Sequence, residues 1–306
     1  MDGEFPQPAP EPDILDLQLP VARSLPLVLA SPHSGTQYPA DFLAASRLDP
    51  VALRRSEDSF VDELFAAGPR LGAPLLAARF PRAYVDVNRE AYELDPGMFA
   101  DALPKFVNAG SPRVRMGLGT IARIVASGEE IYAKKLRFAE VRRRIERLYR
   151  PYHRALRGLV EETEALFGGC LLIDCHSMPS GTDSACERSG ADIVLGDCHG
   201  VSCDPQFVEA ARLFLVDRGF AVAINAPYAG GFTTGHYGRP SAQRHALQIE
   251  VNRALYMNER DYQRKDYFPR LVQDLAELIE ELGRVAQRCV GDPPRTPAWE
   301  REEHAI

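Results

Sequence analysis

Short, mainly apolar runs of strand length recur along the 306-residue chain, and each run ends at a polar, turn-rich cluster. Such runs are typical of strands that are buried in a parallel or mixed sheet. We predict strands over residues 27–30, 74–78, 83–87, 170–173, 193–195, 221–224 and 246–251. Helical patterns lie between them, over residues 58–67, 128–167, 206–218 and 266–287. Strands that alternate with helices predict an α/β fold, a three-layer sandwich with a mixed sheet between helices.

The chain shows no internal repeat, and we expect one α/β domain over residues 21–290. The Pro-rich start predicts a loose tail at residues 1–20, and residues 291–306 predict a second tail. The helical pattern at 128–167 is too long for one ordinary helix. We therefore expect two helices that meet at Pro151, because proline lacks the amide hydrogen that a helix interior uses.

Composition and charge exclude several kinds of partner. The chain has 36 Lys and Arg against 43 Asp and Glu, a net charge of −7, which repels phosphate backbones and anionic lipid. We therefore expect no nucleic-acid partner and, without a long apolar segment, no membrane partner. Six cysteines without CxxC pairs, and a start that does not resemble a signal peptide, predict a soluble cytoplasmic protein. The sequence leaves the oligomeric state open.

Two histidines follow predicted strands. His33 lies in SPHSG after the first strand, and His176 lies in DCHSM after the run CLLID. The ends of strands are where α/β sheets bind ligands, and neutral imidazole is the commonest metal ligand. A catalytic metal needs about three protein ligands, so a carboxylate would complete the set. The alternative is that each histidine only caps a turn.

Carboxylates are available in two segments. Asp58 and Asp62, four residues apart in SEDSFVDELF, share one helix face, although acids in a first helical turn are also favoured by the helix dipole alone. Glu250 lies in a mainly apolar strand, and a buried carboxylate is costly unless it is paired or used. We expect Glu250 to act as a general base, and the alternative is a buried ion pair with Arg253 or another arginine.

The segment RAYVDVNRE offers donors for an anion. Period-two spacing in a strand would place Arg82, Asp86 and Asn88 on one face, with Arg89 at the exit. Paired guanidinium donors suit a substrate carboxylate or a developing oxyanion, and the alternative is a set of surface salt bridges.

A glycine-rich loop over residues 226–242 carries His236, Tyr237 and Arg239. We expect these three residues to contribute to substrate binding, against the alternative of ordinary turn chemistry. The chain contains no phosphate-binding glycine fingerprint and no nucleophile elbow, which removes the main support for dinucleotide-binding and serine-hydrolase interpretations.

Taken together, seven segments resemble the N-formylglutamate amidohydrolase family, in the order PHSGTQYP, DSFVDELF, RAYVDVNRE, DCHSMP, DIVLGDCHG, GGFTTGHYGRP and ALQIEVNRALYM. The resemblance covers about residues 27–257. It implies a zinc carboxypeptidase-like (phosphorylase/hydrolase-like) fold, similar to that of aspartoacylases. It also implies one catalytic Zn²⁺ and the hydrolysis of N-formyl-L-glutamate to formate and glutamate, a late step of histidine degradation.

The resemblance further implies roles for single residues. His33, Asp58 and His176 would hold the zinc, Glu250 would be the general base, and Arg82 would polarise the scissile carbonyl. The substrate is a small N-acyl amino acid, and zinc-activated water would attack its acyl carbon.

Asn88 and Arg89 match the Asn-Arg pair with which carboxypeptidase-like enzymes hold a substrate carboxylate. The chain departs from carboxypeptidases in one respect, since His33 does not begin an HxxE motif. Asp58 is therefore a preference over Asp62, and another divalent metal could replace zinc. Two alternatives remain, a hydrolase of another N-acyl amino acid or small peptide, and a non-catalytic carboxylate-binding protein.

Overall fold

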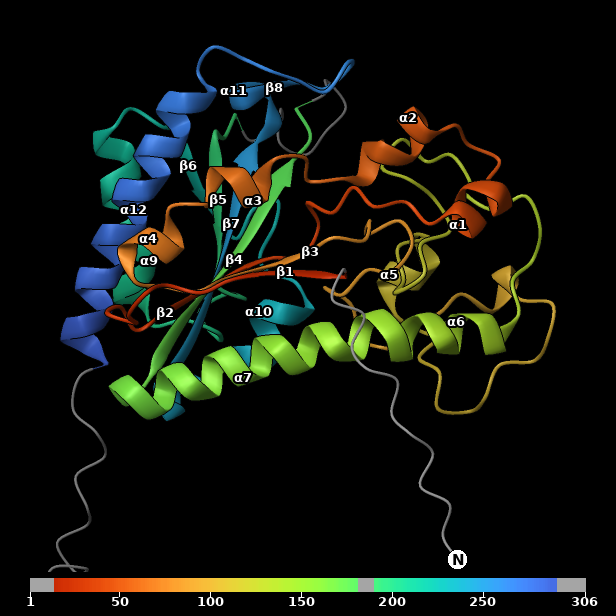
Figure 1. Cartoon of the computed structure of the whole chain (residues 1–306), viewed down its shortest axis with the longest axis horizontal. Coiled ribbons are helices and arrows are strands. Elements are labelled where there is room, and N and C mark those ends of the chain that lie inside the picture. The colour runs from red at the N-terminus through yellow and green to blue at the C-terminus, as the bar shows by residue number, and fades with distance from the viewer. Residues whose placement is uncertain (1–13, 181–189, 291–306) are drawn as a thin grey trace, which may run out of the picture. The chain divides into compact units, whose positions relative to one another are not determined.

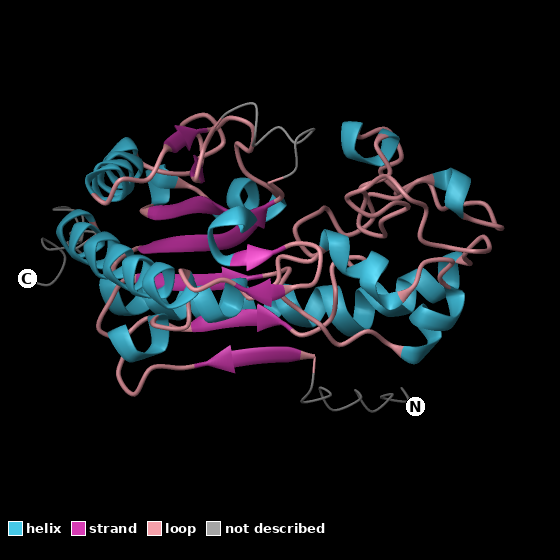
Figure 2. Cartoon of the chain, turned by 90° about the horizontal axis from the view of Figure 1, so that it is seen from above, coloured by secondary structure: helices cyan, strands magenta, loops and turns pink. Residues whose placement is uncertain are grey.

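The computed structural model describes residues 14–180 and 190–290. A seven-stranded sheet has the strand order β1-β3-β2-β4-β7-β5-β6 (Figures 1 and 2). Its strands are β1 (Leu15–Gln18), β2 (Leu27–Ser31), β3 (Leu75–Ala78), β4 (Cys170–Met178), β5 (Ile193–Gly196), β6 (Val222–Ile224) and β7 (Arg244–Asn252). A separate pair consists of β8 (Met257–Asn258) and β9 (Gln263–Arg264).

Parallel pairing at the centre of the sheet confirms the predicted mixed α/β architecture. The strands β2, β4 and β7 are parallel to one another, whereas β5 runs antiparallel to β7. All nine residues of β4 are buried, which is expected for a strand with neighbours on both sides and cover on both faces.

The helices of the described chain differ widely in length. Short ones are α1 (Ala40–Ala45), α2 (Pro50–Leu53), α3 (Val61–Leu64), α4 (Gly68–Leu71), α5 (Pro112–Arg115), α6 (Phe138–Arg144), α10 (Phe232–Tyr237) and α11 (Arg253–Tyr256). Long ones are α7 (Arg150–Phe167), α9 (Pro205–Asp217) and α12 (Phe268–Cys289). The 3-10 turns are η1 (Arg54–Ser56), η2 (Pro96–Met98) and η4 (Pro240–Ala242), and η3 (Ile145–Tyr149) is π-helical.

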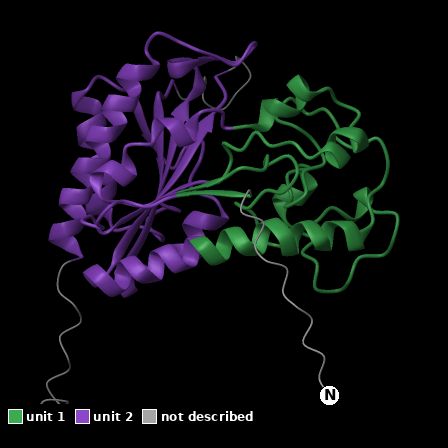
Figure 3. Cartoon of the chain, viewed as in Figure 1, with its two compact units in different colours: residues 1–17, 32–57, 76–155 green, residues 18–31, 58–75, 156–306 purple. Residues whose placement is uncertain are grey.

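The chain divides into two compact units (Figure 3). Unit 1 comprises residues 1–17, 32–57 and 76–155, and unit 2 comprises residues 18–31, 58–75 and 156–306. Each unit is assembled from three separated segments, so no single cut in the chain separates them. The sequence-based expectation of one domain over residues 21–290 stays a prediction, and the predicted tail at 291–306 lies outside the described residues.

The core of unit 2 follows from the alternation of side chains along its strands. Leu171, Ile173 and Cys175 of β4 belong to the same apolar cluster as residues of α9 and α12. Because successive side chains of a strand point to opposite faces, Asp174 and His176 lie on the other face of the sheet. The sheet therefore packs these apolar residues against α9 and α12 and places the side chains of Asp174 and His176 on the opposite, polar face.

Several predicted elements differ from the structure. Residues 83–87 form buried turns and not a strand, since the amide of Tyr84 bonds to Pro81 and that of Asp86 bonds to Thr120 in a loop. The predicted helix over residues 58–67 is reduced to α3, because Phe60 adopts a left-handed φ of 66° before it. Residues 15–18 of the expected tail form the edge strand β1, and residues 1–13 lie outside the described part.

Pro151 does not separate two helices. The chain continues from α6 through the π-helical turn η3 into α7, and Pro151 occupies the second position of α7. A π-helical turn shifts the hydrogen-bond pattern by one residue, and such turns accommodate a residue that cannot donate to the regular pattern. The helical pattern was correct from Phe138 onward, residues 128–137 are not helical, and the predicted break at the proline was wrong.

In unit 1 the charged side chain of Arg144 lies among three aromatic rings. Arg144 is buried, its Nη1 donates to the Tyr132 hydroxyl at 2.7 Å, and its guanidinium carbon lies 4.1 Å from the centre of the Tyr84 ring. Phe42 packs against both rings. A planar guanidinium can stack and donate at the same time, whereas an ammonium cannot reproduce both contacts.

We predict that Arg144→Lys lowers the free energy of unfolding by about 1–3 kcal/mol, since the cation–π contact and the hydrogen bond are both lost. Urea unfolding followed by circular dichroism measures the change. Arg143→Lys, one residue away on the exposed side of the same helix, is the matched control and should leave the midpoint unchanged. Equal midpoints for the two variants would contradict the structural role of Arg144.

Candidate metal centre

The strands β4 and β7 place two candidate residues side by side. His176 is paired with Glu250 in the parallel register, and Asp174 is paired with Gln248. Paired residues of neighbouring strands point to the same face, so these four side chains share the polar face of the sheet. Gln248 Nε2 donates to Glu250 Oε1 at 2.9 Å, which fixes the orientation of that carboxylate.

His33 reaches the same region from β2. That strand pairs with β4 so that Ala30 lies opposite Asp174, and His33 follows two residues after the strand ends. The covalent connection to β2 thus brings this imidazole toward the end of β4 that carries His176. The two strand-end histidines converge as the sequence predicted, since their ligand atoms lie within 4.8 Å of each other.

Asp58 is positioned by the turn before α3. Its side chain is 1% exposed, and its Oδ2 lies 3.1 Å from His176 Nδ1. Asp62, the alternative carboxylate in the sequence, lies within α3 and is only partly buried. Of the two candidates, Asp58 is the one that contacts a candidate histidine ligand.

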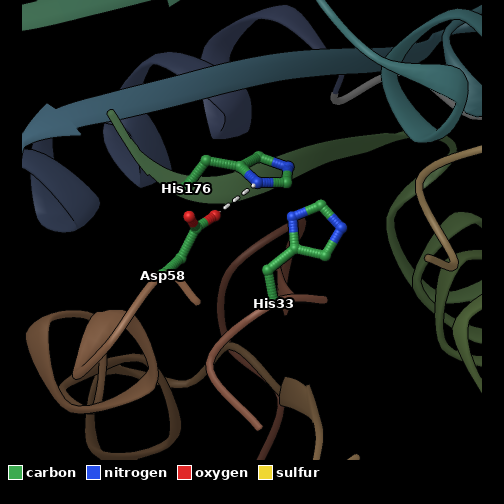
Figure 4. Close-up of side chains that lie close together, drawn as sticks. All are labelled: His33, Asp58 and His176. Carbon is green, nitrogen blue, oxygen red and sulfur yellow. Dashed lines mark hydrogen bonds and ion pairs between the residues drawn. The ribbon is translucent and has the colours of Figure 1, made fainter. Parts of the chain in front are cut away.

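His33, Asp58 and His176 together form a group that could hold a metal ion (Figure 4). Each offers one ligand atom, the three atoms lie within 4.8 Å of one another, and all three residues are buried. Two imidazoles and a carboxylate are a ligand set of the kind that catalytic zinc sites use, with a position left for water or substrate.

Further carboxylates contact the other nitrogen of each histidine. His33 Nε2 lies 2.8 Å from Asp86 Oδ1, and His176 Nε2 lies 3.0 Å from Asp174 Oδ1. Metal-ligating histidines usually have such a partner on the second nitrogen, which fixes the tautomer and the ring orientation. With Nε2 facing a carboxylate, Nδ1 is the nitrogen that each histidine could offer to a metal, and the donor set therefore fits a divalent cation.

The electrostatics of the group favour positive charge. Burial by itself lowers the pKa of His176, but Asp174, Asp58 and Glu250 outweigh burial and hold that pKa well above its usual value. Burial by itself raises the pKa of Asp86, but Arg89, Arg82 and His33 lower it well below its usual value. The same carboxylates would stabilise a bound dication.

The structure gathers the three predicted anion-binding residues around Asp86 in unit 1. Arg82 Nη2 donates to Asp86 Oδ2 at 2.8 Å, and Arg89 Nη2 lies 3.8 Å from the same oxygen. The backbone amide of Asn88 donates to Asp86 Oδ1 at 2.8 Å. Asp86 therefore links these residues to His33, although they lie on turns and not on the predicted strand.

His236 and Tyr237 lie on the helix α10, whose Thr234 donates to Asp174 Oδ2 at 3.1 Å. The predicted loop contains the helix α10, and Arg239 pairs with Arg244 at the start of β7. Arg244 lies six residues from Glu250, a separation of about 20 Å along a strand. His236 is exposed there, and its pKa is lowered by burial of part of the ring and by nearby arginines. The contribution of these three residues to substrate binding stays a prediction.

Three residues at the group were not singled out as site residues from sequence. Asp174 precedes His176 by two residues, so the period of a strand could have indicated it. Asp86 stood beside Arg82 in a segment that was interpreted as a strand. Arg253 was considered only as a partner of Glu250, but its Nη2 donates to Asp58 Oδ1 at 2.8 Å.

The fold and the group define a class of protein, an α/β protein with a mixed sheet and a buried His-Asp-His centre suited to a divalent metal. The model of the N-formylglutamate amidohydrolase family matches residues 25–257. The chain belongs to the N-formylglutamate amidohydrolase family, which confirms the resemblance seen in the sequence, and it is a hydrolase of the N-formylglutamate deformylase type.

Individual relatives agree with this assignment. The N-formylglutamate deformylase of Pseudomonas aeruginosa is 30% identical over 292 residues, covering 92% of this chain and 96% of the relative. The enzyme of the same name from Pseudomonas putida is 29% identical, covering 77% and 83%. The crystal structure of N-formylglutamate amidohydrolase from Ralstonia eutropha JMP134 is 41% identical and superposes with a TM-score of 0.82, covering 90% of this chain and 98% of that chain.

The fold extends to a more distant structure. A gene product from Agrobacterium tumefaciens, Atu2144, is 16% identical with a TM-score of 0.59, which shows a shared fold alone.

Within residues 14–180 and 190–290, no helix is long and apolar enough to cross a bilayer.

We predict that Asp86→Asn weakens metal binding by about 10- to 100-fold, because the amide no longer supplies the charge that orients and polarises His33. Competition with a chromophoric chelator measures the dissociation constant. Asp41→Asn, an exposed carboxylate of unit 1, is the control and should bind metal like the wild type. An unchanged dissociation constant for Asp86→Asn would rule out its support of the site.

Proposed function

We propose that the protein hydrolyses N-formyl-L-glutamate to formate and glutamate, with one zinc ion held by His33, Asp58 and His176. The observation that carries the proposal is the buried His-Asp-His group in a chain of this family. A bound divalent metal supplies a Lewis acid for the formyl oxygen and lowers the pKa of water toward neutrality.

Glu250 is the proposed general base. It lies beside His176 on the polar face of the sheet, it is buried, and Gln248 holds its Oε1 in place. Its carboxylate takes a proton from the attacking water and later returns it to the leaving nitrogen. The C–N bond breaks, the hydroxyl group remains on the formyl carbon, and the nitrogen leaves as the amine of glutamate.

The arginines beside Asp86 suit an anionic substrate. Arg89 is nearly buried and donates from Nε and Nη1 to the carbonyls of Leu118 and Asn88, which fixes its plane. Arg82 has one contact with Asp86 and is 23% exposed. We assign Arg89 and Asn88 to a substrate carboxylate, and Arg82 to the oxyanion that develops on the formyl oxygen.

The first test is formate release from N-formyl-L-glutamate by protein purified without a metal-affinity tag. We expect turnover that chelation abolishes and zinc restores, because the metal activates the water. N-acetyl- and N-succinyl-glutamate in the same assay separate a deformylase from a hydrolase of larger acyl groups. Turnover that survives full removal of the metal would contradict the proposal, and binding without turnover of any substrate would favour a carboxylate-binding protein.

We predict that Glu250→Gln lowers kcat by about 100- to 10,000-fold, since the amide cannot accept the proton. The metal content should stay at the wild-type level, because Glu250 is not one of the three ligands. Glu280→Gln, an exposed residue of α12, is the matched control. Near-normal kcat in Glu250→Gln with metal bound would exclude Glu250 as the base.

A further inference from the structure

The two oxygens of Asp58 have different partners within unit 2. Oδ2 lies 3.1 Å from His176 Nδ1, on the side of the metal group, whereas Oδ1 accepts a hydrogen bond of 2.8 Å from Arg253 Nη2. A carboxylate can bind a metal through one oxygen or through both, and hydrogen bonding to one oxygen opposes the second mode.

Arg253 is itself held firmly. It is 6% exposed, its Nε donates to the hydroxyl of Ser177 at 3.1 Å, and its Nη1 lies 3.7 Å from Glu259. Ser177 follows His176 on β4. The Arg253 guanidinium therefore contacts the proposed ligand Asp58 and also Ser177, the neighbour of the proposed ligand His176. Because the guanidinium is a rigid plane, it fixes the position of Asp58 relative to β4.

The backbone beside Asp58 is held from the same helix. The Tyr256 hydroxyl donates to the carbonyl of Ser59 at 3.0 Å, and Arg253 and Tyr256 are the first and last residues of α11. Phe60, in its left-handed conformation, packs edge-on against Phe268. A non-glycine residue keeps such a φ only where its surroundings enforce it, so the turn that carries Asp58 is strongly constrained.

From these contacts we infer that Arg253 is a positioning residue that keeps Asp58 a one-oxygen ligand of the metal and thereby keeps the coordination number low. The inference rests on the proposed metal site and deepens it. A low coordination number leaves room for water and substrate and favours zinc over ions that prefer more oxygen ligands, such as Mn²⁺.

The test is the visible absorption of the Co²⁺-loaded protein, together with dissociation constants for Zn²⁺ and Mn²⁺. In Arg253→Met the second oxygen of Asp58 is released, so we expect weaker Co²⁺ bands that indicate a higher coordination number. We also expect Zn²⁺ affinity to fall by about 10- to 100-fold, with a smaller loss for Mn²⁺. Identical spectra and affinities for the variant and the wild type would overturn the inference.

Arg264→Met is the matched control. Arg264 stacks on Phe60 and Phe268 and pairs with Glu63, so its loss disturbs the packing of the same turn without removing the described partner of Asp58. The Co²⁺ spectrum of this control should match the wild type, and an equal change in both variants would assign the effect to packing and overturn the inference.

Should Arg253→Met fail to fold, Ser177→Ala removes the hydroxyl that accepts from Arg253 Nε and also contacts Tyr256, and it should shift the spectrum in the same direction by less. An unchanged spectrum in Ser177→Ala would then contradict the inference. None of these measurements uses substrate, so an absence of formate release would refute the proposed function without affecting them. A wild-type protein that binds no Co²⁺ would refute both.

Discussion

The concentration of buried negative charge around two imidazoles is the constraint on which the rest of the site depends. Asp58, Asp86, Asp174 and Glu250 are all buried, and ionised carboxylates in such surroundings are stable only with cationic or hydrogen-bonding partners. Arginines balance part of the negative charge at Asp58 and at Asp86. Thr234 donates a hydrogen bond to Asp174, and Gln248 donates one to Glu250. The remaining negative charge faces the histidines, which is the electrostatic basis for a dication at this position.

Much of this arrangement could be predicted from the sequence because the sheet has a simple period. Apolar runs located six of the seven strands of the sheet, and histidines directly after two of those runs identified His33 and His176. Asp58 was chosen because the metal needs a carboxylate and because the resemblance points to it, whereas Glu250 followed from the energetic cost of a carboxylate in apolar surroundings. The strands could be predicted because their period is local in the sequence and fixes which side chains share a face, whereas the roles of these residues stay predictions.

The failures involve residues whose conformation is set by distant parts of the chain. Residues 83–87 have the composition of a strand, but the amide of Asp86 bonds to Thr120 and its carboxylate bonds to His33 and Arg82, so loop contacts replace a sheet. Arg253 was considered in the sequence only as one possible ion-pair partner of Glu250, whereas its carboxylate partner Asp58 lies 195 residues away. No local pattern encodes such a contact, and only the folded chain shows it.

The positions of these arginines suggest how the site combines rigidity with reactivity. Arg253 contacts a proposed ligand from a buried position in unit 2, where it balances charge without exposure to solvent. Arg82 is partly exposed in unit 1 and contacts Asp86. Asp86 is not a proposed ligand itself, but it contacts the proposed ligand His33. A buried arginine is suited to hold geometry, since moving it would uncover unpaired charges, whereas an exposed arginine can exchange a hydrogen bond with water for one with a substrate at little cost. Burial thus separates the structural role inferred for Arg253 from the recognition role proposed for Arg82.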